Sequence, residues 1–182
     1  MSALKGKTTE QSKTTMTELI MPNDTNPLGN LMGGNLMRWM DICGGICAAK
    51  HSGNHVVTAS VDHISFTAPI KLGDAITINA TVTKAFSTSV EIYIEVYARD
   101  ITGDNPRKSN HAFMTFVALD PIKKKPCPVP PVIPLSAEEQ KLYEAAVRRR
   151  ELRLILAGKM KPEDATEVRS FFDKFPKPAT DQ

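Results

Sequence analysis

Asp41 is the residue of this chain whose type and position most clearly suggest chemistry. From Leu36 to Ala49 the charged residues are Arg38 and Asp41, and most of the others are apolar. We expect a helix that is apolar on most sides to lie in a core, where an unpaired carboxylate is costly. Asp41 can therefore form an ion pair with Arg38, three residues away, or it can serve a site as a general base or nucleophile.

Gly33 and Gly34 precede this segment and would lie where the helix begins. A helix N-terminus has free backbone N–H groups and the positive end of the helix dipole, and glycine lets a carbonyl group approach both. That is the geometry of an oxyanion hole. Asp41 would lie about two helical turns further along. Gly44 and Gly45 would share its face of the helix and leave the carboxylate uncovered.

Cys43, Cys47 and His51 follow at spacings of four residues and would form a row along the same helix. One helical row rarely supplies a closed tetrahedral metal site. The alternative is two buried thiols and a histidine near the C-terminal end of the helix dipole. We therefore expect no metal and no cofactor, and the sequence contains no phosphate-binding loop and no Gly-x-Ser-x-Gly motif.

The elements that would position these residues follow from hydrophobic periodicity and turn signals. The helix is expected over residues 35–51, and period-two patterns predict strands. The strands expected are 15–21, 55–66, 75–86, 90–99 and 111–119. Short connections favour antiparallel neighbours. The predicted fold class is α+β, with an antiparallel sheet wrapped around a long central helix.

The flanking segments differ in composition from this body, which we place at residues 15–120. Residues 1–14 are polar and are expected to be a disordered lead. Residues 121–134 form a proline-rich linker, and residues 135–182 a helical extension that opens with a capping box at Ser136. The run Arg148-Arg149-Arg150 in this extension is either a solvated helix face or a site for the phosphate of a nucleotide regulator.

The overall composition narrows the partners. The formal net charge is +3, without a basic surface large enough for nucleic acid. No apolar run approaches the length of a membrane span, so we expect no membrane partner. Three cysteines, two of them in the apolar helix, fit free thiols in a reducing compartment, and the expected location is cytoplasmic.

A family resemblance adds to this. The run Pro22-Asn-Asp-Thr-Asn26, then Gly29-Asn30, Gly33-Gly34 and Trp39-Met-Asp41, resembles the acyl-coenzyme A thioesterases of the hotdog fold. The resemblance continues through residues 57–66, 69–74 and 87–97, and covers roughly residues 15–120. It implies hydrolysis of acyl-CoA to a free acid and coenzyme A. It also implies a homodimer with paired sheets and active sites at the interface, which a helical extension can assemble into a hexamer, a trimer of dimers.

The resemblance assigns roles to individual residues. Asn26, in the loop before the helix, and Asp41, within it, match the catalytic pair of the family, contributed by opposite subunits. For coenzyme A itself, the backbone of Ser87-Thr88-Ser89 could pair with the pantetheine amides. Lys84 and Arg99 are candidate phosphate partners, although a solvated sheet face is the alternative for both.

Two other functions are compatible with the same fold. A non-hydrolytic acyl-CoA binding or sensing module would bind the ester without turnover and would not need Asp41. A dehydratase of this fold would use a histidine with an acid, and no histidine lies in the loop or in the first turns of the helix. The sequence therefore favours the hydrolase.

Overall fold

The structure is a computed structural model that describes residues 4–62, 64–103 and 105–174. The chain forms two compact units, Met1–Leu135 and Ser136–Gln182. The first unit contains the sheet and the long helix, and the second contains two further helices.

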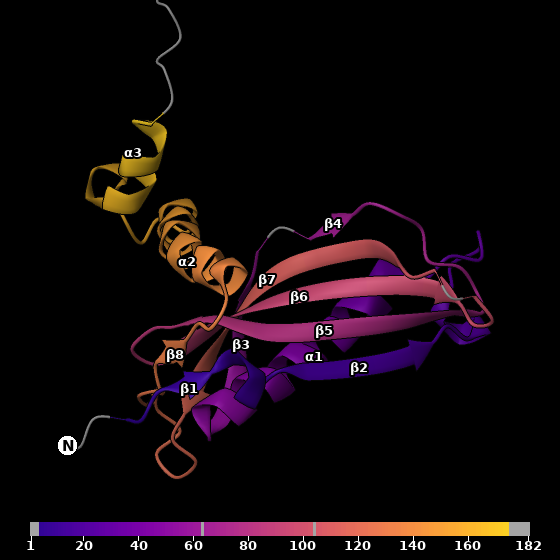
Figure 1. Ribbon diagram of the computed structural model, residues 1–182, viewed down its shortest axis with the longest axis horizontal. Helices are drawn as coiled ribbons and strands as arrows, with labels where there is room; N and C mark the ends of the chain where they lie inside the picture. Colours follow the sequence, from indigo (N-terminus) through magenta and orange to yellow (C-terminus); the bar gives the residue numbers. More distant parts are fainter. Residues whose placement is uncertain (1–3, 63, 104, 175–182) are drawn as a thin grey trace, which may run out of the picture. The chain divides into compact units, whose positions relative to one another are not determined.

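The main sheet of the first unit is antiparallel and runs in the order β2-β5-β6-β7-β3 (Figure 1). Residues 86–88 join β5 to β6, and the pairings of β5 with β6 and of β6 with β7 continue in register apart from local bulges. A sixth, two-residue strand, β4 (Ser65–Phe66), also pairs with β7. The strands are β2 (Thr14–Leu19), β5 (Asp74–Ala85), β6 (Ser89–Asp100), β7 (Arg107–Leu119) and β3 (His55–Val61).

Helix α1 (Gly33–Ser52) lies against one face of this sheet, so the predicted wrapped sheet with a central helix is confirmed. Alternate residues of β5 and β6, among them Ile78 and Ile94, are fully buried toward the helix. Gly44 allows this close packing. A Cβ atom there would lie 3.0 Å from side-chain atoms of Ile94 and Phe116, whereas one at Gly45 would be 3.7 Å from Phe116.

The expected disordered lead over residues 1–14 is wrong from residue 7 onward. Strand β1 (Lys7–Thr8) pairs in parallel with β8 (Val132–Ile133), and a 3₁₀ turn, η1, follows at Thr9–Gln11. The Lys7 ammonium also donates to the carbonyl oxygens of Lys50 and His51 at the end of α1, at 2.9 and 2.8 Å. A polar segment is ordered here because it satisfies the last carbonyls of a helix.

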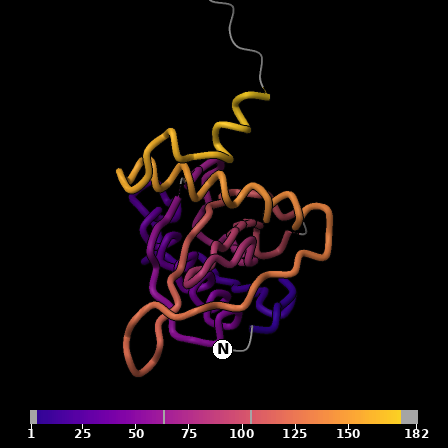
Figure 2. Tube along the Cα trace, turned by 90° about the vertical axis from the view of Figure 1, so that its left-hand side faces the viewer, coloured from indigo at the N-terminus to yellow at the C-terminus, as the bar shows by residue number. Residues whose placement is uncertain are grey.

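The segment expected to be a proline-rich linker, residues 121–134, packs as part of the first unit. It leaves β7 as a projecting loop and returns as β8 (Figure 2). Val129 and Val132 are buried, and the carbonyl oxygen of Pro130 lies 3.0 Å from Nε2 of buried His51. The linker prediction is therefore corrected, because apolar residues between the prolines anchor this segment.

The second unit begins with α2 (Ala137–Leu156), whose predicted capping box is formed by Ser136 and Glu139. A 3₁₀ turn, η3 (Pro162–Asp164), and α3 (Thr166–Phe172) follow. The buried Glu151 carboxylate accepts hydrogen bonds from the backbone N–H groups of Glu167 and Val168, at 3.3 and 2.8 Å. None of the described helices is both long and apolar enough to cross a membrane.

Candidate active site

Asp41 is half-buried on the side of α1 that faces β3. Its Oδ1 atom accepts a hydrogen bond from the Thr58 hydroxyl of β3, at 2.5 Å. The alternative ion pair with Arg38 is absent from the described part of the chain. The carboxylate borders an open groove of about 380 Å³, which Ile42 and Ile46 also line. Asp41 is thus a carboxylate fixed by one hydrogen bond at a groove.

Thr58 did not stand out in the sequence. It lies within a strand whose pattern predicted only secondary structure, and a threonine in a strand is ordinary. Its hydroxyl reaches Asp41 because β3 lies beside α1, a tertiary contact with no local signal. The 17 residues from Asp41 to Thr58 comprise the rest of α1, the turn after it and the start of β3.

The N-terminus of α1 carries no side-chain cap. The N-cap residue is Met32, and its carbonyl oxygen accepts from the N–H groups of Asn35 and Leu36. A Cβ at Gly33 would lie 3.3 Å from the ring of Phe66, whereas one at Gly34 would meet nothing within 4 Å. The backbone at Gly34 is therefore open to an approaching group, as an oxyanion hole needs.

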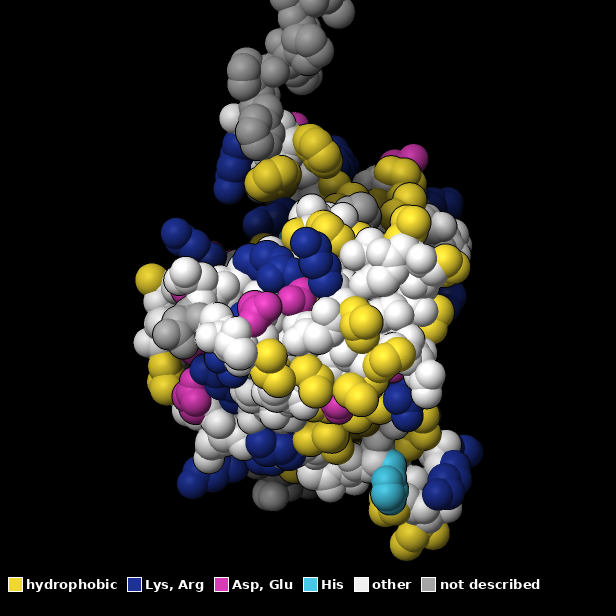
Figure 3. All heavy atoms as spheres, turned by 90° about the vertical axis from the view of Figure 1, so that its right-hand side faces the viewer, with side chains coloured by type: hydrophobic (Ala, Val, Ile, Leu, Met, Phe, Trp, Pro, Cys, Tyr) yellow, Lys and Arg dark blue, Asp and Glu magenta, His cyan; other side chains and the backbone are white. Residues whose placement is uncertain are grey.

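Hydrophobic side chains lie in a band across the end of the first unit where β2 ends and α1 begins (Figure 3). Among the exposed large hydrophobic residues are Met21 and Leu28, in the segment between β2 and α1, and Leu72. Such an apolar surface beside a helix N-terminus is suited to a partner or ligand rather than to water.

Asn26 shapes the loop that leads into α1. Its Oδ1 atom accepts from the N–H groups of Leu28 and Asn30, at 2.9 and 3.2 Å, and Gly29 takes the left-handed conformation that closes the turn. Its Nδ2 group has no hydrogen-bond partner among the residues that the structure describes. Within one chain, no hydrogen bond among the described residues joins Asn26 to Asp41.

Comparisons with known proteins decide the family. The pattern of the thioesterase superfamily matches residues 28–103. The chain is 36% identical over 140 residues to an uncharacterized acyl-CoA thioester hydrolase of Bacillus subtilis, YkhA, and the match covers 77% of this chain and 81% of that protein. The chain belongs to the acyl-coenzyme A thioesterase family.

Solved structures agree with this assignment to the thioesterases. An apo-hexameric acyl-CoA thioesterase matches with a TM-score of 0.81 and 36% identity, over 85% of this chain and 98% of that one. An acyl-CoA hydrolase of Staphylococcus aureus, in complex with butyryl coenzyme A and coenzyme A, matches with a TM-score of 0.76 and 35% identity, over 85% and 93%. Further structures of that hydrolase carry alanine in place of an asparagine, an aspartate and a threonine. The thioesterase chain therefore has the hotdog fold.

The residues predicted to hold coenzyme A occupy separate places in the thioesterase. Ser87 and Thr88 lie in the turn between β5 and β6, and Ser89 is the first residue of β6. The carbonyl oxygens of Ser87 and Thr88 accept from the N–H groups of Val129 and Ala118. The N–H groups of this turn remain the candidates for pantetheine, except where the strand ladder uses them.

Lys84 and Arg99 of one chain lie far apart on the main sheet. Lys84 pairs in register with Glu91 on β6, and Arg99 lies eight residues further along that strand. At about 3.3 Å per residue their backbones are roughly 26 Å apart. Arg99 is exposed and lines a shallow hollow with Tyr97, whereas Lys84 is half-buried. Within one chain, at most one of them can bind a given phosphate group of the substrate.

The row of possible metal ligands along α1, which is Cys43, Cys47 and His51, forms hydrogen bonds with different partners. The thiols of Cys43 and Cys47 donate to carbonyl oxygens of β5, of Ile78 and Ala80 respectively. Burial raises the pKa of Cys43 to about 11 and that of Cys47 to about 12, so both stay protonated at neutral pH. His51 instead contacts Ser12 and the loop before β8, and burial lowers its pKa.

The arginine run of the second unit is largely engaged within that unit. Arg148 lies over the ring of Phe171, at 4.9 Å from its centroid, and Arg149 donates to the carbonyl oxygen of Leu142 at 2.8 Å. These contacts favour a structural role for the two arginines over the nucleotide-phosphate site that was the alternative.

Proposed function

We propose that this protein hydrolyses acyl-CoA esters with Asp41 as the general base or nucleophile and the N-terminus of α1 as the oxyanion hole. The observation that carries the proposal is the 2.5 Å hydrogen bond from Thr58 to Asp41 in an open groove beside α1. A carboxylate with one oxygen held and the other free can act on a water molecule or on a carbonyl carbon.

The reaction needs few groups. In the general-base form, the Asp41 carboxylate takes a proton from water while the water oxygen attacks the thioester carbonyl carbon. The carbonyl electrons move to oxygen, where the uncapped N–H groups at Gly33 and Gly34 stabilise the negative charge. Collapse of this intermediate breaks the C–S bond, and the coenzyme A thiolate leaves and takes up the proton that Asp41 accepted, which restores the Asp41 carboxylate. In the nucleophile form, the Asp41 carboxylate attacks the carbonyl carbon, the C–S bond breaks and the coenzyme A thiolate leaves. Water then hydrolyses the mixed anhydride to the free acid and restores the Asp41 carboxylate.

The spacing of three residues supports the same assignment. In the Staphylococcus aureus hydrolase, the asparagine, aspartate and threonine that were replaced by alanine are separated by 15 and 17 residues. Asn26, Asp41 and Thr58 have the same two spacings. We infer that these three residues act together here, with the free Nδ2 group of Asn26 orienting the water or the substrate carbonyl.

A second copy of the chain would complete the site. Met37, Ile42 and Ile46 on α1 expose 45%, 39% and 46% of their surface, although the sequence predicted a buried helix. Beside them, β3 is the last strand of the main sheet and exposes Val57 and Val61. An apolar edge strand is suited to pairing with another chain. Such pairing supports a homodimer in which Asn26 of one subunit and Asp41 of the other share a site.

Further assembly is proposed through the second unit. Leu152, Leu156, Phe171 and Phe172 of α2 and α3 are exposed. Apolar side chains on a small helical unit favour packing on a neighbour. Since one structural relative is hexameric, we propose a trimer of dimers.

The function is tested by thiol release from a panel of acyl-CoA esters, with Asp41→Asn as the variant and Asp164→Asn, at an exposed position of the second unit, as the matched control. Loss of a general base is expected to lower kcat by about a hundredfold or more, while the control keeps wild-type turnover.

The alternative, a non-hydrolytic acyl-CoA binding or sensing module, gives a different result. It predicts binding by the wild-type protein without thiol release, and no effect of Asp41→Asn on that binding. Calorimetric titration with the same esters distinguishes the two functions.

A further inference from the structure

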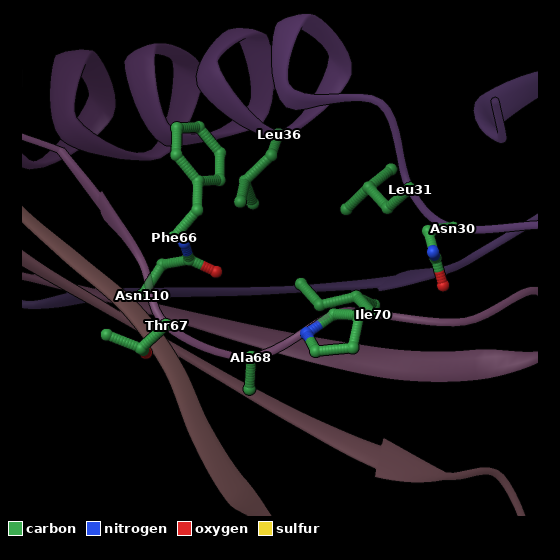
Figure 4. A pocket seen from close by; sticks show the side chains of 9 residues that line it. Asn30, Leu31, Leu36, Phe66, Thr67, Ala68, Ile70 and Asn110 are labelled. Carbon is green, nitrogen blue, oxygen red and sulfur yellow. The ribbon is translucent and has the colours of Figure 1, made fainter. Parts of the chain in front are cut away.

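A second cavity lies at the N-terminal end of α1, outside the groove that Asp41 borders. It has a volume of about 320 Å³ and lies between the first turn of α1 and residues 66–70 (Figure 4). Its lining is mostly apolar and has three polar members, Asn30, Thr67 and Asn110. The apolar members are Leu31, Leu36, Phe66, Ala68, Pro69 and Ile70.

Side chains of β7 hold one wall of this cavity in place. Asn110 Nδ2 donates to the carbonyl oxygen of Ser65 at 2.7 Å, and Ser109 Oγ donates to that of Ala68 at 2.8 Å. The Arg107 guanidinium donates to the carbonyl oxygen of Pro69 at 3.2 Å. Three residues near the start of β7 thus fix an irregular segment by its carbonyl groups. The cavity is preformed, as ligand sites usually are.

The polar groups of Asn110 are already used. Its Oδ1 lies 2.6 Å from Ser109 Oγ, its Nδ2 donates to the carbonyl oxygen of Ser65, and the residue is 1% exposed. Asn110 therefore supports the wall, and the cavity offers mainly hydrocarbon surface to a ligand.

The position of Phe66 connects the cavity to the proposed oxyanion hole. Two atoms of its ring lie 3.3 Å from where a Cβ would be at Gly33, the first residue of α1, yet Phe66 is 59% exposed. A thioester whose carbonyl oxygen meets the N–H groups of this first turn would have its acyl chain next to the Phe66 ring. The apolar walls continue from there.

We propose that this cavity takes the acyl chain of the substrate and selects medium-length chains, an inference that rests on the proposed hydrolase function. A volume of 320 Å³ holds about ten groups, at roughly 30 Å³ for a group the size of water. Each methylene group that becomes buried raises the affinity by a factor of at most about four. The specificity constant kcat/KM should rise with chain length, then stop rising near ten carbon atoms, when the cavity is full.

Leu31 allows the size of the cavity to be changed in both directions. It is half-buried, and its side chain points toward Leu36 across the open space (Figure 4). Leu31→Trp is expected to lower the ratio of kcat/KM for octanoyl-CoA to that for butyryl-CoA by about tenfold or more, since it removes room for two or more methylenes. Leu31→Ala is expected to move the end of the rise to longer chains, as is Phe66→Ala.

The controls are Leu4→Trp and Leu4→Ala, at an exposed leucine of the N-terminal segment, which should leave the octanoyl-to-butyryl ratio at the wild-type value. Circular dichroism establishes that each variant is folded. If Leu31→Trp does not fold, Leu31→Ala and Phe66→Ala decide by their length profiles. A length profile that is the same in the wild type and in every folded cavity variant overturns the proposal.

Failure of the hydrolase function has a separate signature. A wild-type protein that releases thiol from none of the esters contradicts the proposed function. Calorimetric titration with butyryl-CoA and octanoyl-CoA then gives the affinity ratio for the wild type and the Leu31 variants. A ratio that these variants shift supports the cavity, and one that they leave unchanged overturns it.

Discussion

Replacing Thr58 by valine removes the hydroxyl that donates to Asp41 and keeps the branched shape that suits a strand. A hydrogen bond to an ionised group contributes about 1.5–3 kcal/mol, which corresponds to roughly tenfold to a hundredfold in rate if the bond acts in the transition state. Thr58 is exposed in the single chain, so water can replace part of this bond, and the lower end of the range applies. We expect kcat to fall about tenfold with little change in KM.

The assay is thiol release from butyryl-CoA over a range of concentrations. Thr58→Ser should keep most of the activity because it retains the donor. The matched control is Thr17→Val, at an exposed threonine of β2 on the opposite edge of the main sheet, which should behave as wild type. If Thr58→Val keeps full kcat while Asp41→Asn is inactive, the hydroxyl does not position the carboxylate and the reasoning from this contact is wrong.

Three further predictions concern stability and architecture. Burial lowers the pKa of His51, so the unfolded chain binds a proton more readily than the folded protein does. The free energy of unfolding should therefore fall as the pH decreases below about 6.5. Urea unfolding between about pH 7.5 and 5 checks this, and the dependence of stability on pH should be weaker in His51→Gln. Gly44→Ala should destabilise the fold by about 1–3 kcal/mol, because the added methyl group would overpack the core. Gly45→Ala has room for the methyl group and should stabilise the fold by up to about 1 kcal/mol. Thermal unfolding measures both, and equal shifts of Tm in the two variants would contradict this prediction. A chain that ends at Leu135 should stay folded and lose only higher assembly, as measured by light scattering. A chain that ends at Lys125 lacks β8 and should unfold more readily. Equal stability of the two truncated chains would refute the anchoring role of residues 126–135.

The long elements were predictable because their patterns are local. The expected strand over residues 90–99 is β6 (Ser89–Asp100), where apolar residues alternate with polar ones. The capping box at Ser136 likewise determines where α2 begins. In each case one signal, periodicity or a cap, is contained in a few consecutive residues.

The parts that were missed depend on contacts between distant segments. Strands β1 and β8 have two residues each and lie more than 120 residues apart in the chain, so neither has a pattern of its own. Thr58 gains its significance only from the packing of β3 beside α1. The apolar character of α1 was interpreted as burial in its own core, but sequence cannot separate a core from a subunit contact.

The central claim is that residues of two subunits form one active site, and mixing inactive variants tests it most directly. Asn26→Ala and Asp41→Ala are purified with different tags, exchanged, and the doubly tagged dimers are isolated and assayed for thiol release. Each mixed dimer should have one intact site of two, so the isolated mixed dimers should show about half of wild-type activity, and the unfractionated equal mixture about a quarter. Isolated mixed dimers with no activity above the parent variants would contradict a site shared between subunits.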